Sequence, residues 1–170
     1  FKSSDYGITW ENADTNLTNL SVYDIKIRES DIFVGTDNGI YKSNNNGSSW
    51  TLFNSGLSIT DIDDLIVNRT IIYATAKKGI FISTNYGENW KSANYNLSFT
   101  NNNVSSIAKY GSDIYISTYG AGIFFSSADG ENWNPINNNL PDLNVFKIEF
   151  IENSIYAICE SGLFLSTNFG

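Results

Sequence analysis

Short apolar stretches alternate with clusters of Gly, Asn, Asp and Ser along the whole chain of 170 residues. Between residues 61 and 92, four such stretches run over about 61–67, 71–75, 79–83 and 89–92. They are rich in β-branched and aromatic residues and are bounded by turn residues, which predicts strands. No segment keeps an apolar period of 3.6 residues long enough for a helix. The pattern therefore predicts an all-β fold.

This four-strand pattern returns at an almost constant interval. A turn containing glycine occurs five times, and its glycines, at positions 7, 47, 87, 130 and 170, are 40, 40, 43 and 40 residues apart. Other columns keep the same register, namely Leu17, Leu57, Leu97 and Leu140, and Phe33, Tyr73, Tyr115 and Tyr156. A repeat of about 40 residues with four antiparallel strands is one blade of a β-propeller. We therefore predict a β-propeller with about four blades in this chain.

The register also divides the chain into units. They are the end of a preceding blade at 1–21, three blades at 22–61, 62–103 and 104–144, and an incomplete blade at 145–170. Because both ends fall within a blade, we expect a segment of a larger propeller, in which further blades of the same chain follow. The alternative is a closed four-bladed ring whose last blade takes its fourth strand from the N-terminal segment, although residues 166–170 would then duplicate residues 3–7.

The recurring turn resembles the Asp-box, or bacterial neuraminidase repeat, whose pattern is Ser/Thr-x-Asp-x-Gly-x-Thr/Ser-x-Trp or a shorter form ending Thr-Trp. The first copy, SSDYGITW at 3–10, fits the motif fully. The copies SNNNGSSW at 43–50 and STNYGENW at 83–90 have Asn at the acidic position, and the last, STNFG, occupies 166–170. The fourth copy, SSADGENW at 126–133, has Ala128 there and Asp129 one place later, so its usual turn hydrogen bonds are in doubt.

The motif is typical of a hairpin turn rather than of a reaction centre. Asp or Asn accepts hydrogen bonds from nearby backbone N–H groups, Gly supplies a positive φ, and Trp buries apolar area beside the turn. The resemblance implies turns between the third and fourth strands, away from any ligand or catalytic face. We assign this structural role to Ser3, Asp5, Gly7, Trp10, Ser43, Asn45, Gly47, Trp50, Ser83, Asn85, Gly87, Trp90, Ser126, Gly130, Trp133, Ser166, Asn168 and Gly170.

Composition argues against several classes of function. A net charge of −8 and a pI near 4.3 argue against nucleic-acid binding. No apolar run approaches the ~18 residues of a membrane span, so direct membrane insertion is not expected. The chain has no His and a single Cys159, which excludes Cys–His and Ser–His nucleophile pairs, His-containing zinc sites and an internal disulfide. We expect no metal site and no cofactor.

The surface composition bears on location. Only 16% of the residues are charged, so solubility depends mainly on Asn, Ser and Thr. Such a surface suits an extracellular or cell-surface protein, although an AT-rich genome also produces an excess of Asn.

Enzymes with this turn need residues that can be checked here. The resemblance to sialidases implies three arginines for the substrate carboxylate, but the chain holds only Arg28 and Arg69. Xyloglucan-cleaving glycoside hydrolases are a better enzymatic comparison, and they use two aspartates across a cleft. Asp61, Asp63 and Asp64 are the most suggestive acids here, but strand alternation sends the last two to opposite faces. We interpret these acids as solvated side chains at a strand edge, and part of a glycoside hydrolase remains the alternative.

A ligand is expected on the face opposite the glycine turns. In an up-and-down blade, the loops between strands two and three share that face with the connections to the next blade. Aromatic rings interleaved with polar groups suit glycan or peptide contact by stacking and hydrogen bonding. The candidate contacts are Tyr95, Phe99, Tyr119 and Asp142.

Together these features predict a non-catalytic extracellular or cell-surface β-propeller module that binds proteins or glycans, within a larger secreted protein. The chain resembles propellers of secreted bacterial proteins, which often carry a C-terminal sorting domain for type IX secretion. It is more distantly similar to sortilin-type receptors and photosystem II assembly factors. A structural subunit that self-associates through its open blade faces is the third interpretation.

Overall fold

The computed structural model describes residues 1–17, 21–77, 79–97, 103–127, 130 and 132–170. All the regular structure in these residues is β-strand, and no helix long and apolar enough to cross a membrane is found among them. The strands form antiparallel sheets in chain order, three with four strands and one with three.

Each sheet is one blade. Blade 1 contains β1 (Val22–Arg28), β2 (Asp31–Thr36), β3 (Gly39–Ser43) and β4 (Thr51–Leu52), and blade 2 contains β5 (Ile62–Asn68), β6 (Ile71–Ala76), β7 (Gly79–Ser83) and β8 (Lys91–Ser92). Blade 3 contains β9 (Asn103–Tyr110), β10 (Asp113–Tyr119), β11 (Gly122–Ser126) and β12 (Asn134–Pro135), and blade 4 contains β13 (Val145–Ile151), β14 (Ser154–Cys159) and β15 (Gly162–Ser166).

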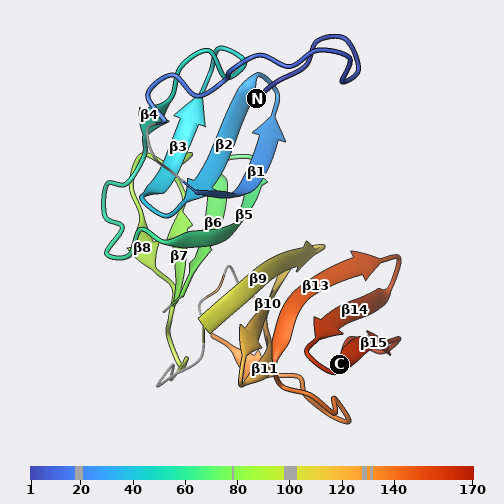
Figure 1. Ribbon diagram of the computed structural model, residues 1–170. Coiled ribbons are helices and arrows are strands. Elements are labelled where there is room, and N and C mark those ends of the chain that lie inside the picture. Colours follow the sequence, from blue (N-terminus) through green and yellow to red (C-terminus); the bar gives the residue numbers. More distant parts are fainter. Residues whose placement is uncertain (18–20, 78, 98–102, 128–129, 131) are drawn as a thin grey trace.

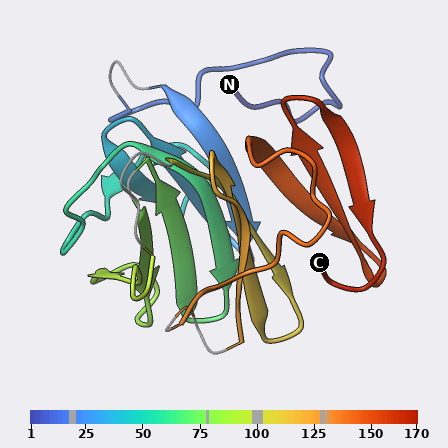
Figure 2. The same cartoon turned by 90° about the horizontal axis from the view of Figure 1, so that it is seen from below.

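The blades stand side by side on an arc, with β1, β5, β9 and β13 along its inner side (Figure 1). Consecutive inner strands contact one another, while the short strands β4, β8 and β12 form the outer edges. Figure 2 shows the same succession of blades from below. Antiparallel meanders arranged around a common inner side form a β-propeller, so the predicted fold class is confirmed.

The apolar core lies between the blades. At each junction, the earlier blade contributes an aromatic residue of its second strand and an Ile of its third strand, and the later blade contributes aliphatic residues of its first two strands. The three sets are Phe33, Ile40, Leu65 and Ile72; Tyr73, Ile80, Ile107 and Ile114; and Tyr115, Ile123, Ile148 and Ile155. Because the same contact repeats, each blade depends on its neighbour for stability.

The glycine turns join the third and fourth strands, and side chains hold them closed. In the third copy, Ser83 Oγ accepts a hydrogen bond from Gly87 N (2.8 Å) and donates one to Asn85 Oδ1 (2.9 Å). The same Asn85 oxygen accepts from Asn89 N (3.0 Å). Gly87 has a φ of 90°, which costs glycine little because it has no Cβ. The serines of the first, second and fifth copies make the same two hydrogen bonds.

The fourth turn differs from the other four. Ala128 and Asp129 lie outside the described residues, but the sequence alone shows that Ala128 brings no side-chain acceptor. The hydroxyl of Ser126 is buried and has no hydrogen-bond partner among the described residues. Among the described residues, the fourth turn therefore lacks the serine hydrogen bonds that the other four copies make.

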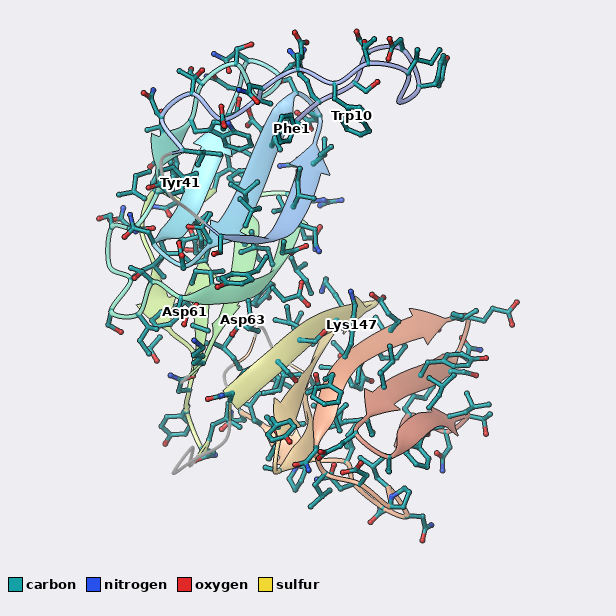
Figure 3. The ribbon with its side chains drawn as sticks, viewed as in Figure 1. Phe1, Trp10, Tyr41, Asp61, Asp63 and Lys147 are labelled. Atoms are coloured by element: carbon teal, nitrogen blue, oxygen red, sulfur yellow. The ribbon has the colours of Figure 1, made fainter. Side chains whose placement is uncertain are left out.

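The tryptophans of the turns connect each blade to the one before it by packing and hydrogen bonding. Trp50, Trp90 and Trp133 are buried, and their indole N–H groups donate to the carbonyls of Ala13, Phe53 and Ala93 at 2.8, 2.8 and 3.0 Å. Trp10 is an exception to the expected burial, because it is 64% exposed on the N-terminal hairpin (Figure 3). The reason is that no blade precedes Trp10 in the described residues.

Candidate functional site

Each inner strand carries one extra residue near its beginning. The pairing of β1, β5, β9 and β13 with the second strand of its blade shifts there, which leaves Tyr23, Asp63, Ser105 and Phe146 unpaired. Such a β-bulge bends the strand and re-aims a side chain, and bulges are common beside active sites. Because the four residues occupy the same position in their blades, they lie along one edge of the inner face, which we call the bulge rim.

Two aromatic residues meet at the bulge rim between blades 3 and 4. Tyr119 ends β10, and its backbone pairs with Asn144 just before β13. Its ring lies 5.5 Å from that of Phe146, with 32° between the ring planes. Both rings are partly exposed. We call Tyr119 and Phe146 the aromatic platform.

Polar groups are fixed along one edge of the aromatic platform. Glu160 Oε2 accepts hydrogen bonds from the Tyr119 hydroxyl (3.2 Å) and from Asn144 Nδ2 (2.7 Å). Asp142 accepts from Asn144 N (2.9 Å) and Ser161 N (2.7 Å). The hydrogen bonds from Ser161 and Asn144 lower the pKa of Asp142, and the hydrogen bond with Glu160 raises the pKa of Tyr119. At neutral pH Asp142 is therefore ionised and the phenol of Tyr119 is protonated.

Two acidic side chains lie close together in the blade 2 part of the bulge rim. Asp61 and Asp63 lie near each other at the start of β5 (Figure 3), and Asp61 forms an ion pair with Lys77. Burial, followed by the charge of Asp61, raises the pKa of Asp63 to about 6, against the opposing effect of Lys77. A carboxyl with such a pKa can hold or release a proton near neutral pH.

Asp64 is not the solvated acid expected from the sequence. Its side chain is buried and accepts hydrogen bonds from Ser106 Oγ (3.0 Å) and Ile107 N (3.1 Å) of blade 3. It also contacts Lys26 of blade 1 at 3.5 Å. Burial raises the pKa of Asp64 even though donors surround it. Since its oxygens bind groups of blades 1 and 3, Asp64 joins three blades and is not available to a ligand at the rim.

Comparison with known proteins identifies the family. Residues 65–170 match the family described as the DUF6242 β-propeller domain. The chain belongs to this family. Among curated protein sequences there is no match to it.

The solved structures similar to this DUF6242 propeller include an enzyme, an extracellular domain and a protein bound to a peptide. One is an ancestral GH74 enzyme, at 25% identity and a TM-score of 0.72, with 88% of this chain and 23% of that chain covered. Another is the extracellular domain of BT4673 from B. thetaiotaomicron (19% identity, TM-score 0.72, 92% and 23% covered). A third is YCF48 bound to D1 peptide (14% identity, TM-score 0.64, 84% and 50% covered). The last two likenesses show the fold alone, and the chain spans 23% of the length of each of the first two.

The DUF6242 propeller brings together two of the four residues predicted to contact a ligand. Tyr119 and Asp142 lie on the same polar edge of the aromatic platform. Tyr95 is exposed elsewhere, in a cavity of about 320 Å³ that it lines with Lys91 and Asn132 at the outer strand of blade 2. Phe99 lies outside the described residues.

Sequence reasoning did not single out the second ring of the platform. Phe146 stands in the same column as Tyr23, Asp63 and Ser105, a set with no common chemistry. The strand pairing reveals the bulge that links them. No group of three or more His, Cys, Asp or Glu residues suited to a metal ion occurs in the described part of the chain.

Proposed function

We propose that this DUF6242 propeller is a non-catalytic, extracellular or cell-surface module that binds a protein or a glycan at the aromatic platform. The pairing of Tyr119 with Phe146, two partly exposed rings beside one another, carries this proposal. Glu160, Asn144 and Asp142 border the rings with fixed donors and acceptors. Apolar ring faces with oriented polar groups at their edge suit a sugar or an extended peptide segment.

We also infer that the glycine turns are Asp-boxes with a structural role. The hydrogen bonds from Ser to Asp or Asn and from Gly to Ser, found in four of the five copies, support this assignment. They lie between the third and fourth strands, whereas Tyr119 and Asp142 lie at the opposite ends of the strands. The BT4673 domain is extracellular by its description, and we extend that location to this chain as part of the proposal.

The test begins with a screen of immobilised glycans, xyloglucan oligosaccharides among them, and of a displayed peptide library. The affinity of each ligand found is then measured by calorimetry for the wild type and for Tyr119→Ala and Phe146→Ala. Loss of one stacked ring should weaken binding about tenfold, since such contacts contribute ~1 kcal/mol or slightly more. Tyr95→Ala removes an exposed aromatic residue away from the platform and should leave the affinity unchanged. Equal losses in all three variants would contradict the proposed site.

A glycoside hydrolase is the second candidate, and Asp63 is the observation that favours it. A rim carboxyl with a pKa of about 6 has the property of a general acid. Hydrolysis of a β-glucan that Asp63→Asn abolishes, with folding intact, would overturn the non-catalytic proposal. Binding without turnover would support it.

A further inference from the structure

A lysine side chain of the protein itself occupies an aromatic pocket between blades 1 and 2. Lys42 of β3 forms an ion pair with Asp31 of β2, with 2.8 Å between Nζ and Oδ2. The same ammonium group lies 4.5, 5.5 and 5.7 Å from the ring centroids of Tyr86, Phe33 and Phe53. Both side chains of the ion pair are largely buried, at 18% and 17% exposure. One carboxylate and three rings therefore hold one ammonium group in this place, which we call the lysine pocket.

The junction between blades 3 and 4 repeats the acid and the apolar walls of the lysine pocket. Their counterparts in the repeat register are Asp113 for Asp31, Tyr115 for Phe33, Ile136 for Phe53 and Phe169 for Tyr86. With Tyr110 and Phe125, these counterparts line a cavity of about 490 Å³, which we call the open pocket. The ring centroids of Tyr110 and Phe169 are 5.2 Å apart, as are those of Tyr115 and Phe125. The volume is in the range of small-ligand sites.

The cations of the lysine pocket are replaced by aromatic rings in the open pocket. Phe125 stands at the position of Lys42. Tyr110 stands at the position of Arg28, whose guanidinium lies 5.5 Å from the centroid of a ring in the lysine pocket. Asp113 forms no ion pair with a Lys or Arg in the described part of the chain. The open pocket therefore keeps the groups that bind a cation, while the cations themselves are replaced.

Asp113 is placed to act on a cation in the open pocket. It begins β10 and is partly buried, and Ser112 Oγ donates a hydrogen bond to its Oδ1 (3.1 Å). Burial, followed by the charge of Asp113, raises the pKa of Tyr115. The carboxylate therefore lies close enough to a ring of the pocket to act on it electrostatically.

The lysine pocket shows that a complete glycine turn leaves this space open. The turn of blade 2 continues to Trp90, whose indole N–H donates to Phe53 O at 2.8 Å. Trp90 is buried there, and Lys42 still lies beside Tyr86. A turn that continues in the same way after Phe169 therefore does not fill the open pocket.

We propose that the open pocket binds the ammonium group of a lysine side chain from a partner protein. The ammonium group takes the place that Lys42 has in the lysine pocket, with its charge toward Asp113 and its alkyl chain against the rings. The net charge of −8 favours such a basic partner. The open pocket lies at the glycine-turn ends of the strands, whereas the aromatic platform lies at the opposite ends. It is therefore a second site, independent of the one proposed above.

The probe for this site is N-acetyl-lysine amide, and its matched control is N-acetyl-norleucine amide, which lacks the side-chain nitrogen. NMR titration of the 170-residue chain follows the methyl groups of Ile136 and the backbone amide of Phe169, which line the pocket. The lysine probe should shift these signals with millimolar affinity, because single ion pairs and ring contacts are weak. The norleucine probe should bind about tenfold more weakly. Equal affinities, or no shift with the lysine probe, would overturn the proposal.

A third probe separates the two sources of an ammonium group. Butylammonium has the alkyl chain and the charge of lysine without its peptide groups. Affinity for N-acetyl-lysine amide at least equal to that for butylammonium supports a protein lysine. Clearly tighter binding of butylammonium would overturn the protein partner and assign the pocket to a free amine.

Two variants of equal charge test the role of the carboxylate. Asp113→Asn removes the charge with little change in size and should weaken the lysine probe roughly tenfold. Asp37→Asn removes the same charge from an exposed loop of blade 1, at the opposite ends of the strands, and should leave the affinity unchanged. Equal losses in the two variants would mean that net charge alone attracts the probe, which would overturn the site.

Exchanging the occupants of the two pockets tests their equivalence. Phe125→Lys supplies an internal ammonium group at the position of Lys42 and should abolish binding of the lysine probe beside Asp113. Lys42→Ala empties the lysine pocket and should create a second binding site beside Asp31. Far-UV circular dichroism checks that each variant is folded, and the Asp113→Asn comparison stands if either is not. Unchanged binding to folded Phe125→Lys, or no second site in folded Lys42→Ala, would overturn the proposal.

Discussion

The bulge at Asp63 makes the charge of this residue depend on folding. Its pKa rises from the ordinary value of 3.8 to about 6, mainly through burial. Between these values the folded state holds the extra proton, so the free energy of unfolding falls as the pH rises through this window. Asp63→Asn should therefore raise the free energy of unfolding at pH 7.5 by about 1 kcal/mol, since the group is half-exposed, and raise the melting temperature with it. The two proteins should melt alike near pH 3, where both side chains are neutral.

For Asp142, stability is expected to change with pH in the opposite direction. The hydrogen bonds from Ser161 and Asn144 lower its pKa, so its ionised form stabilises the fold and this contribution disappears as the pH falls below its ordinary value. Asp142→Asn should lower the melting temperature at pH 7.5, and this effect should shrink as the pH falls below 3.8. The same thermal scans check both variants, and a gain for both at pH 7.5 would contradict the assigned environments.

At the scale of the element, the glycine turns offer a matched pair of serines. Ser83 Oγ satisfies Gly87 N and Asn85, so Ser83→Ala should destabilise the protein by about 1–2 kcal/mol. Ser126 has a buried hydroxyl without a partner among the described residues. Ser126→Ala should therefore be neutral or slightly stabilising. Chemical unfolding of the two variants measures the difference, and equal losses would show that Ser126 has a partner after all.

The same elements show which features the sequence predicts. Strand positions follow from apolar stretches and turn residues, which are local, and the propeller follows from their 40-residue period. A bulge is not local, because it is a mismatch between two strands. The residue types at Asp63 and Phe146 do not indicate it. The packing partner of a side chain is not local either. Trp10 fits the motif fully and is still exposed, since burial requires a neighbouring blade.

At the scale of the whole molecule, the candidate site depends on contacts between blades. The aromatic platform takes one ring from blade 3 and one from blade 4, so neither blade presents it alone. The sequence identified Tyr119 and Asp142 because loop aromatic and acidic residues are recognisable in any blade. Their proximity to Phe146 and Glu160 follows only from the way the two blades pack.

The buried Asp64 tests how strongly the blades depend on one another. It accepts hydrogen bonds from Ser106 and Ile107 of blade 3 and contacts Lys26 of blade 1. Asp64→Ala should lower the free energy of unfolding by about 3 kcal/mol, the cost typical of breaking a buried polar contact of this kind. It should also reduce the steepness of the urea transition, because blades that lose a shared contact unfold less cooperatively.

Asp61→Ala is the control for this prediction, since its ion pair with Lys77 is partly solvated and exposed pairs contribute ~1 kcal/mol or less. Tryptophan fluorescence and circular dichroism, followed through the same urea titration, report on the blade junctions and on the sheets respectively. In the wild type the two transitions should coincide, and in Asp64→Ala they should separate. Coincident transitions at an unchanged midpoint would mean that apolar packing alone couples the blades, and that the buried carboxylate contributes nothing to holding the arc together.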